Sequence, residues 1–202
     1  MIKQSKQAGV ADRSADYVVG GSVALRRAGN RQWVLKPQDL AVALKLVTLA
    51  GSRLTYAELG KRLRLSQFEA HAAVQRLMAA RLVVDLGEGP RPVMAALRNF
   101  VVYGASYCYP AVRGQATIGF PTAYAVAPLN DLVLFSQEMP PVWPHPEGVV
   151  RGIALLPLYE KLPLAALDDP KLYELLSLFD ALRMGQARER ELATKLLEQR
   201  LQ

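Results

Sequence analysis

Cysteine and histidine are scarce in this chain of 202 residues, and their scarcity removes several classes of site. The single cysteine, Cys108, cannot form an intrachain disulfide, and it favours a reducing, cytoplasmic location. Its neighbours Tyr107 and Tyr109 predict a buried, structural thiol rather than a redox sensor. The two histidines, His71 and His145, lie far apart in the sequence. Because no His/Cys cluster has the spacing of a zinc site, we expect neither a metal nor a cofactor.

Motifs of catalysis and long hydrophobic runs are also missing. The chain has no phosphate-binding glycine-rich loop and no nucleophile elbow. The apolar run 40–50 is interrupted by Lys45, and the run 93–102 is interrupted by Arg98. Neither run is long enough to cross a bilayer. We therefore expect no catalytic residues, no enzymatic activity and no membrane span.

Positive charge is concentrated in one half of the chain. Hydrophobic residues make up 51% of the sequence, which is enough for a core, and the formal net charge is +7. Residues 1–100 hold sixteen Lys/Arg and seven Asp/Glu, whereas residues 101–202 hold nine and eleven. A basic half favours contact with a polyanion, and the alternative is a basic surface that is merely solvated.

Two short helices joined by a tight turn are predicted after Leu54. Thr55 suits the N-cap of the first helix, and Glu58 places a negative charge in its first turn. The first helix should end near Leu63, and its residues at helical spacing should face inward: Tyr56, Leu59 and Leu63.

Ser66 begins the second predicted helix, because Ser66 and Glu69 have the spacing of a capping box. Small and apolar residues at helical spacing should bury one face of this helix: Ala70, Ala73, Val74 and Leu77. The run 82–84 then predicts a strand. The order of elements is that of a helix-turn-helix followed by the start of a wing.

The opposite face of the second helix is polar. Gln67, His71 and Gln75 follow one another at intervals of four residues, so they form one stripe, flanked by Phe68, Ala72 and Arg76. Gln can read adenine in the major groove, and His and Arg can contact bases or phosphates. The candidate base-reading residues are Gln67, Phe68, His71 and Gln75. The alternative is the ordinary polar face of a soluble helix.

Basic side chains surround the two helices and are candidates for phosphate contacts, which give affinity and salt dependence without sequence choice. These candidates are Arg53, Lys61, Arg62, Arg64, Arg76 and Arg91.

The segment from Pro37 to Val84 resembles the winged helix-turn-helix of bacterial transcription regulators, including the MarR-like group. The matching pieces are the predicted helix 40–49, the run LTYAELGKRLRLSQFEAHAAVQRL and the exit Ala80-Arg81-Leu82-Val83. The resemblance, over about residues 37–93, implies double-stranded DNA as partner and 66–80 as the recognition helix. Two features depart from it. Ala72 stands where a long polar residue is common, and the turn 85–92 has one basic and two acidic residues. Both leave room for a protein partner.

The whole chain is predicted to be mainly α, of mixed α+β class. Residues 1–30 read as a flexible basic arm, residues 31–104 as the winged helix-turn-helix domain, and residues 105–202 as an assembly or partner-binding region. Seven prolines between positions 110 and 146 favour short strands and loops there. Helices should follow, one beginning at Pro170 and one spanning 187–201.

Regulators that read inverted repeats need two copies of the helix, so we expect a homodimer. The last helix is its predicted seam, through Leu192, Leu196 and Leu197; the alternative is that this stripe packs within its own subunit. The sequence thus predicts a DNA-binding transcription regulator. The alternative is an antitoxin-like module that neutralises a protein partner through residues 105–202 and regulates its own operon.

Overall fold

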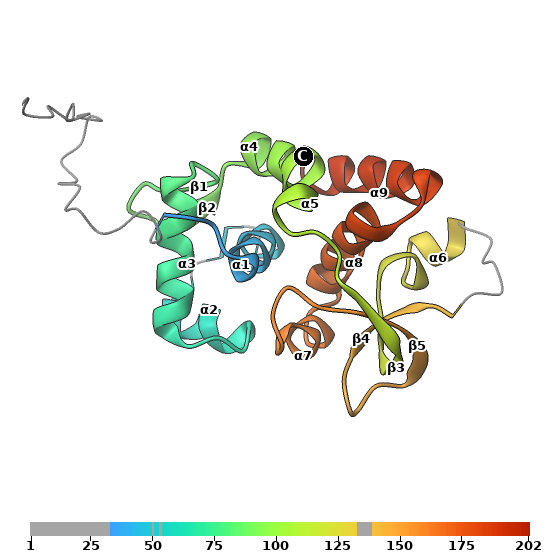
Figure 1. Ribbon diagram of the computed structural model, residues 1–202. Coiled ribbons are helices and arrows are strands. Elements are labelled where there is room, and N and C mark those ends of the chain that lie inside the picture. The colour runs from blue at the N-terminus through green and yellow to red at the C-terminus, as the bar shows by residue number, and fades with distance from the viewer. Residues whose placement is uncertain (1–32, 50, 53, 133–138) are drawn as a thin grey trace, which may run out of the picture.

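The computed structural model describes residues 33–49, 51–52, 54–132 and 139–202. The predicted arm 1–30 and the candidate Arg53 lie outside these residues. Helices and a small sheet occur together, so the mixed α+β class is confirmed. Three N-terminal helices and a short hairpin lie on one side of the molecule, and a three-stranded sheet lies on the other (Figure 1).

The N-terminal helices are α1 (Pro37–Thr48), α2 (Tyr56–Arg62) and α3 (Gln67–Ala79). Strands β1 (Val83–Asp85) and β2 (Pro90–Pro92) follow as an antiparallel hairpin, with Val84 opposite Arg91. The predicted inward residues of α3 are all buried, and so are Leu59 and Leu63 of the first predicted helix, while Tyr56 is partly buried. The short helices therefore gain their stability from the face they bury rather than from length.

Both predicted caps are present. The hydroxyl oxygens of Thr55 and Ser66 accept hydrogen bonds from the backbone N–H groups of Glu58 and Glu69. Each glutamate in return accepts from the backbone N–H of its cap residue. The capping-box prediction for Ser66 and Glu69 is confirmed, and α2 has the same arrangement. These hydrogen bonds pair N–H groups that the first turn of a helix leaves free.

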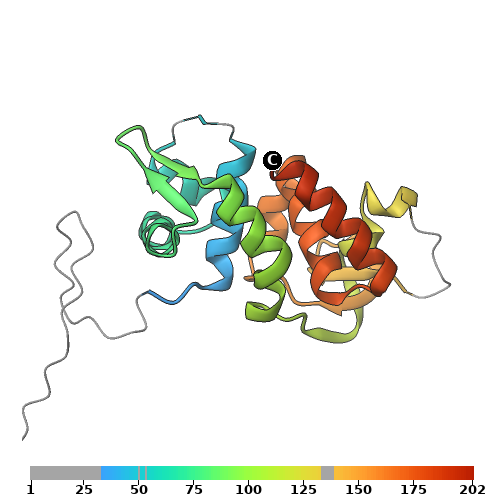
Figure 2. The same cartoon turned by 90° about the horizontal axis from the view of Figure 1, so that it is seen from above.

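One helical rod follows the hairpin: α4 (Met94–Asn99), a π-helical turn (Phe100–Gly104) and α5 (Ala105–Cys108). The rod therefore runs without a break from Met94 to Cys108. The prediction that Cys108 is buried was wrong, because its side chain is exposed while the next residue, Tyr109, is buried. The rod lies beside the last helix of the chain (Figures 1 and 2). Tyr103 Oη donates to Glu198 of that helix at 2.8 Å.

The proline-rich segment forms the sheet. Strand β3 (Arg113–Pro121) pairs antiparallel with both β4 (Pro141–Pro144) and β5 (Val150–Leu155), and β4 pairs parallel with β5, so the three strands close on themselves. A 3₁₀ turn (Ala123–Ala125) and α6 (Leu129–Leu132) follow β3. Trp143 of β4 is buried, and its Nε1 donates to Asp180 at 2.7 Å.

Helices α7 (Leu162–Leu167), α8 (Pro170–Met184) and α9 (Ala187–Arg200) complete the chain. Asp169 caps α8 by accepting from the N–H groups of Lys171 and Leu172, and Pro170 stands at the first position, as predicted. Helix α8 is buried along most of its length and contacts α1, α7 and α9. One hydrophobic core therefore runs from α1 to the end of α9. None of the described helices is long and apolar enough to cross a membrane.

Candidate nucleic-acid interface

Four exposed side chains follow one face of α3. Gln67, Phe68, His71 and Gln75 are all exposed, whereas Ala70, Val74 and Leu77 on the other face are buried. The stripe predicted from the sequence is therefore a real surface. Phe68 is the exception in chemistry, since 83% of this large apolar residue is exposed to solvent. The residues that the structure describes leave most of this ring uncovered, which makes it a candidate contact for another molecule.

His71 is held by an aromatic contact. Its ring lies edge-on to Tyr56 of α2, with 4.8 Å between the ring centroids and an interplanar angle of 85°. Burial, with a smaller contribution from the Asp85 charge, raises the pKa of Tyr56, so its hydroxyl stays neutral in the physiological range. The contact limits the rotamers of the imidazole.

Arg76 was predicted to contact phosphate, and this prediction is wrong. The side chain is buried, and its guanidinium donates to both carboxylate oxygens of Asp39 in α1, from Nε at 2.7 Å and from Nη2 at 2.6 Å. A buried guanidinium has to be paired because an isolated charge inside a protein is very costly. Arg76 therefore fastens α3 to α1 and is unavailable to a ligand.

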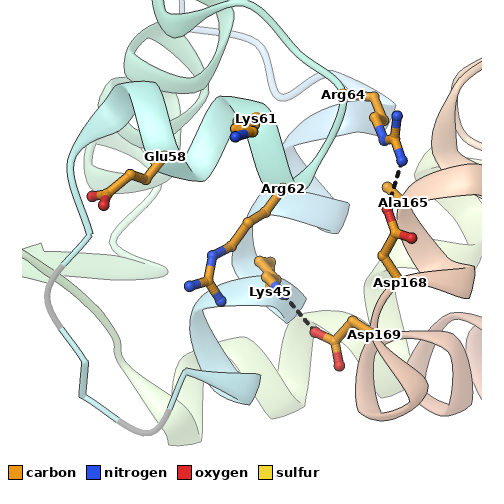
Figure 3. Close-up of a pocket in the computed structure, with 8 residues that line it drawn as sticks. All are labelled: Lys45, Glu58, Lys61, Arg62, Arg64, Ala165, Asp168 and Asp169. Carbon is orange, nitrogen blue, oxygen red and sulfur yellow. Dashed lines mark hydrogen bonds and ion pairs between the residues drawn. The ribbon is translucent and has the colours of Figure 1, made fainter.

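Lys61, Arg62 and Arg64 are exposed, as predicted, but they line a groove rather than a flat surface (Figure 3). The groove has a volume of about 620 Å³ and lies between α2, the end of α1 and the turn from α7 to α8. Its full lining comprises Lys45, Glu58, Lys61, Arg62, Arg64, Ala165, Asp168 and Asp169. The structure thus gathers three predicted phosphate contacts, from α2 and the turn after it, opposite two aspartates from the C-terminal part of the chain.

Two ion pairs join the walls of this groove. Arg64 Nη2 lies 2.7 Å from Asp168 Oδ2, with both side chains about half exposed, and Lys45 Nζ lies 2.6 Å from Asp169 Oδ2 with little exposure. Burial alone would raise the pKa of Asp169. The hydrogen bonds from Lys45, the backbone of Leu172 and Thr48 outweigh burial and hold that pKa below its ordinary value. Asp169 is therefore charged and fully engaged.

The turn between α2 and α3 is fixed by the C-terminal part of the chain. Tyr159 Oη donates to the backbone oxygen of Leu63 at 2.8 Å. The next residue, Arg64, adopts a φ of 56°, in the left-handed region that non-glycine residues rarely occupy. Gly60 makes the turn compact, because a Cβ there would lie 2.8 Å from the backbone oxygen of Leu65. The orientation of α3 is thus tied to residues beyond position 150.

The hairpin has the weak cationic character that its sequence predicts. Arg91 is exposed but forms an ion pair with Glu88. Asp85 Oδ1 accepts from the N–H groups of Gly87 and Gly89, which fixes the loop. Leu86, at the tip, is 84% exposed. The tip therefore presents an apolar side chain beside an acidic one, and its single arginine is already paired.

The predicted dimer residues lie against their own subunit. Leu197 is fully buried, so its prediction as a surface contact was wrong, and Leu192 and Leu196 are partly buried on the same core. The reason is that α8 supplies a broad apolar face to which α9 packs. The homodimer itself stays a prediction.

Sequence reasoning missed the contribution of Lys45, Asp168 and Asp169 to the groove. The helix start predicted at Pro170 did not reveal that Asp169, just before it, pairs with Lys45, 124 residues away. Among the described residues, no group of three or more His, Cys, Asp or Glu side chains is arranged to hold a metal ion. Comparisons of the chain with family models, curated proteins and solved structures found no match.

Proposed function

We propose that the protein is a DNA-binding transcription regulator and that residues 37–92 act as a winged helix-turn-helix. The observation that carries the proposal is the exposed stripe of α3. Three long or ring-bearing polar side chains, Gln67, His71 and Gln75, share one face of a capped helix whose other face is buried. These side chains offer donors and acceptors of the kind that read base edges in the major groove.

The dimensions of α3 support this role. The helix has 13 residues, which corresponds to about 20 Å at 1.5 Å per residue. A helix of this size reads only a few base pairs, so a second copy is needed to read an operator with two half-sites. A homodimer is therefore part of the proposal. Its contact surface must include residues other than Leu197, which is buried in its own chain.

Phosphate contacts are expected from a smaller set than the sequence predicts. Lys61 and Arg62 are exposed next to the turn that leads into α3, whereas Arg76 is buried and Arg91 is paired. Because the salt dependence of binding scales with the number of neutralised phosphates, we expect a shallow salt slope for each protomer.

The test is a binding titration with the protein's own upstream DNA at several salt concentrations, in parallel with a shuffled duplex of equal length. The double variant Gln67→Ala/His71→Ala should lose roughly 1–3 kcal/mol of discrimination for each base contact removed. Gln199→Ala, an exposed glutamine on α9, is the matched control and should bind like the wild type. If the double variant distinguishes the upstream DNA from the shuffled duplex as well as the wild type does, Gln67 and His71 do not read bases.

A second candidate function is favoured by two exposed apolar residues. Phe68 and Leu86 are 83% and 84% exposed, and an apolar side chain of this kind at the tip of a hairpin suits a protein interface better than phosphate. The corresponding proposal is an antitoxin-like module that binds a protein partner. Co-expression with the product of the neighbouring open reading frame tests it. Phe68→Ser/Leu86→Ser should abolish a complex that Gln67→Ala/His71→Ala leaves intact.

A further inference from the structure

Two cations in the groove between α2 and the α7–α8 turn lack a close ion pair with any described residue, although the Glu58 carboxylate interacts with Arg62 at longer range. The carboxylates of the groove are all engaged: Glu58 accepts from the backbone N–H and the hydroxyl of Thr55, Asp168 pairs with Arg64, and Asp169 pairs with Lys45. Lys61 and Arg62, in contrast, form no ion pair with any residue in the described part of the chain. The groove therefore has positive charge available to bind an anion.

Arg64 is a third cation within reach of the same space. Its partner Asp168 has a side chain 61% exposed, and Arg64 itself is 47% exposed. An ion pair with this exposure contributes little to stability, so an incoming anion can compete with Asp168 for the guanidinium. In Figure 3 the three cations and Asp168 border one opening, with Arg62 pointing toward the Lys45 side and Arg64 toward Asp168.

The size and chemistry of the groove define the occupant. A volume of about 620 Å³ lies in the range of small-molecule sites. Ala165 is the one apolar residue among its eight lining residues, so the directional contacts that the walls offer come from charged side chains. A guanidinium binds phosphate oxygens in pairs, and a lysine ammonium adds a point charge. This combination suits a compact anion with at least two charges.

We propose that this groove is a binding site for a small phosphorylated molecule, with its phosphate held by Lys61 and Arg62 and joined by Arg64. The proposal goes beyond DNA binding and does not depend on it. The bound ligand also contacts the turn that leads into α3, because Arg64 lies two residues before Ser66, the N-cap of that helix. A ligand that takes Arg64 from Asp168 removes one of the side-chain contacts that tie this turn to the C-terminal part; the hydrogen bond from Tyr159 to Leu63 is another.

The test is calorimetric titration of the full chain with inorganic pyrophosphate, without DNA and at constant ionic strength. The variant Lys61→Gln/Arg62→Gln should raise the Kd at least about tenfold, as expected for the loss of two charge-assisted hydrogen bonds. Both side chains are exposed, so the variant should fold, which circular dichroism checks. The matched control is Arg188→Gln/Arg190→Gln on α9, which removes the same charge from exposed positions and should keep the Kd within about twofold.

A gain of affinity provides a second measurement. Asp168→Asn frees Arg64 and removes a negative charge from the wall, so the Kd for pyrophosphate should fall about three- to tenfold. If both double variants lose the same affinity for pyrophosphate, the binding is general attraction to positive charge, and the proposed site is wrong.

A parallel measurement of binding to duplex DNA distinguishes this proposal from the regulator proposal. If Lys61→Gln/Arg62→Gln weakens binding to duplex DNA while the wild type takes up no pyrophosphate, the cations serve the DNA backbone and the small-molecule site is wrong. If pyrophosphate binds as expected but no duplex binds, the site stands and the regulator proposal fails.

Discussion

Arg76 of α3 and Asp39 of α1 form a buried, two-pronged ion pair, with hydrogen bonds of 2.7 and 2.6 Å. Asp39 also accepts from the backbone N–H of Lys36 at 2.8 Å, so one carboxylate caps α1 and anchors α3. The hydrogen bonds that Arg76 donates to Asp39 raise the pKa of Arg76 above its ordinary value, against the opposing effect of burial. The candidate base-reading helix is therefore fixed to the core by a charge pair in addition to apolar packing.

The first prediction is that breaking this pair is strongly destabilising. Arg76→Ala or Asp39→Ala should lower the free energy of unfolding by about 3–5 kcal/mol, because each leaves an uncompensated buried charge. The double variant should lose less than the sum of the two single losses. Urea titration followed by circular dichroism measures these values, and Arg62→Ala, at an exposed position, should stay within about 0.5 kcal/mol of the wild type. Strict additivity would show that the two side chains do not act as a pair.

The second prediction concerns Leu197, which is fully buried against its own chain. Leu197→Ala should lower the free energy of unfolding by about 2–5 kcal/mol through the lost contacts and the cavity left behind. The molar mass from light scattering should be that of the wild type. Lys195→Ala, two residues earlier and exposed, is the control. If the Leu197→Ala protein keeps its stability but changes its molar mass, Leu197 contacts a second subunit rather than the core of its own chain.

The third prediction is a loss of stability in alkali. Burial, with a smaller contribution from the Asp180 charge, raises the pKa of Tyr173 to about 12, and its hydroxyl donates to the backbone oxygen of Pro121. The ordinary pKa of tyrosine is 10.0, so above that pH the unfolded chain loses a proton that the folded chain keeps. The free energy of unfolding should therefore fall between about pH 10 and pH 12.

Denaturant titrations at several pH values, comparing the wild type with Tyr173→Phe, isolate this contribution. The phenylalanine variant should be less stable near neutral pH, because the hydrogen bond to Pro121 is lost, but its stability should fall less steeply in alkali. Tyr107→Phe, on an exposed ring, controls for the substitution itself. If the free energy of unfolding depends on pH in the same way in the wild type and in Tyr173→Phe, Tyr173 is not the source of the loss of stability in alkali.

Local signals in the sequence were sufficient to place α2, α3 and α8. Ser66 with Glu69, and Asp169 before Pro170, mark helix starts through hydrogen bonds within three residues, so the sequence alone carries them. Cys108 illustrates a limit of the same reasoning. Neighbours on a helix point about 100° apart, so the apolar character of Tyr107 and Tyr109 does not determine the exposure of the residue between them.

The other features that the sequence did not predict depend on contacts between residues far apart in the chain. Arg76 borders the predicted stripe, and nothing within its own helix reveals that Asp39, 37 positions earlier, buries it. The groove depends on residues 45, 58–64 and 165–169, and the closed sheet depends on the pairing of β3 with two later strands. An apolar stripe such as that of α9 fits an intrachain core and a dimer seam equally well until the face that covers it is known.

The last prediction tests whether the C-terminal part holds the turn before α3. Tyr159→Phe removes the hydroxyl that donates to Leu63 and should lower the free energy of unfolding by about 0.5–1.5 kcal/mol. The effect should be local. Amides of the turn, such as Leu65 N–H bonded to the backbone oxygen of Gly60, should exchange with solvent faster, whereas the amides of α9 should keep their relative protection. Hydrogen exchange resolved by residue measures both regions in one sample. Uniform acceleration over the chain would mean that Tyr159 contributes only to global stability and does not set the position of α3.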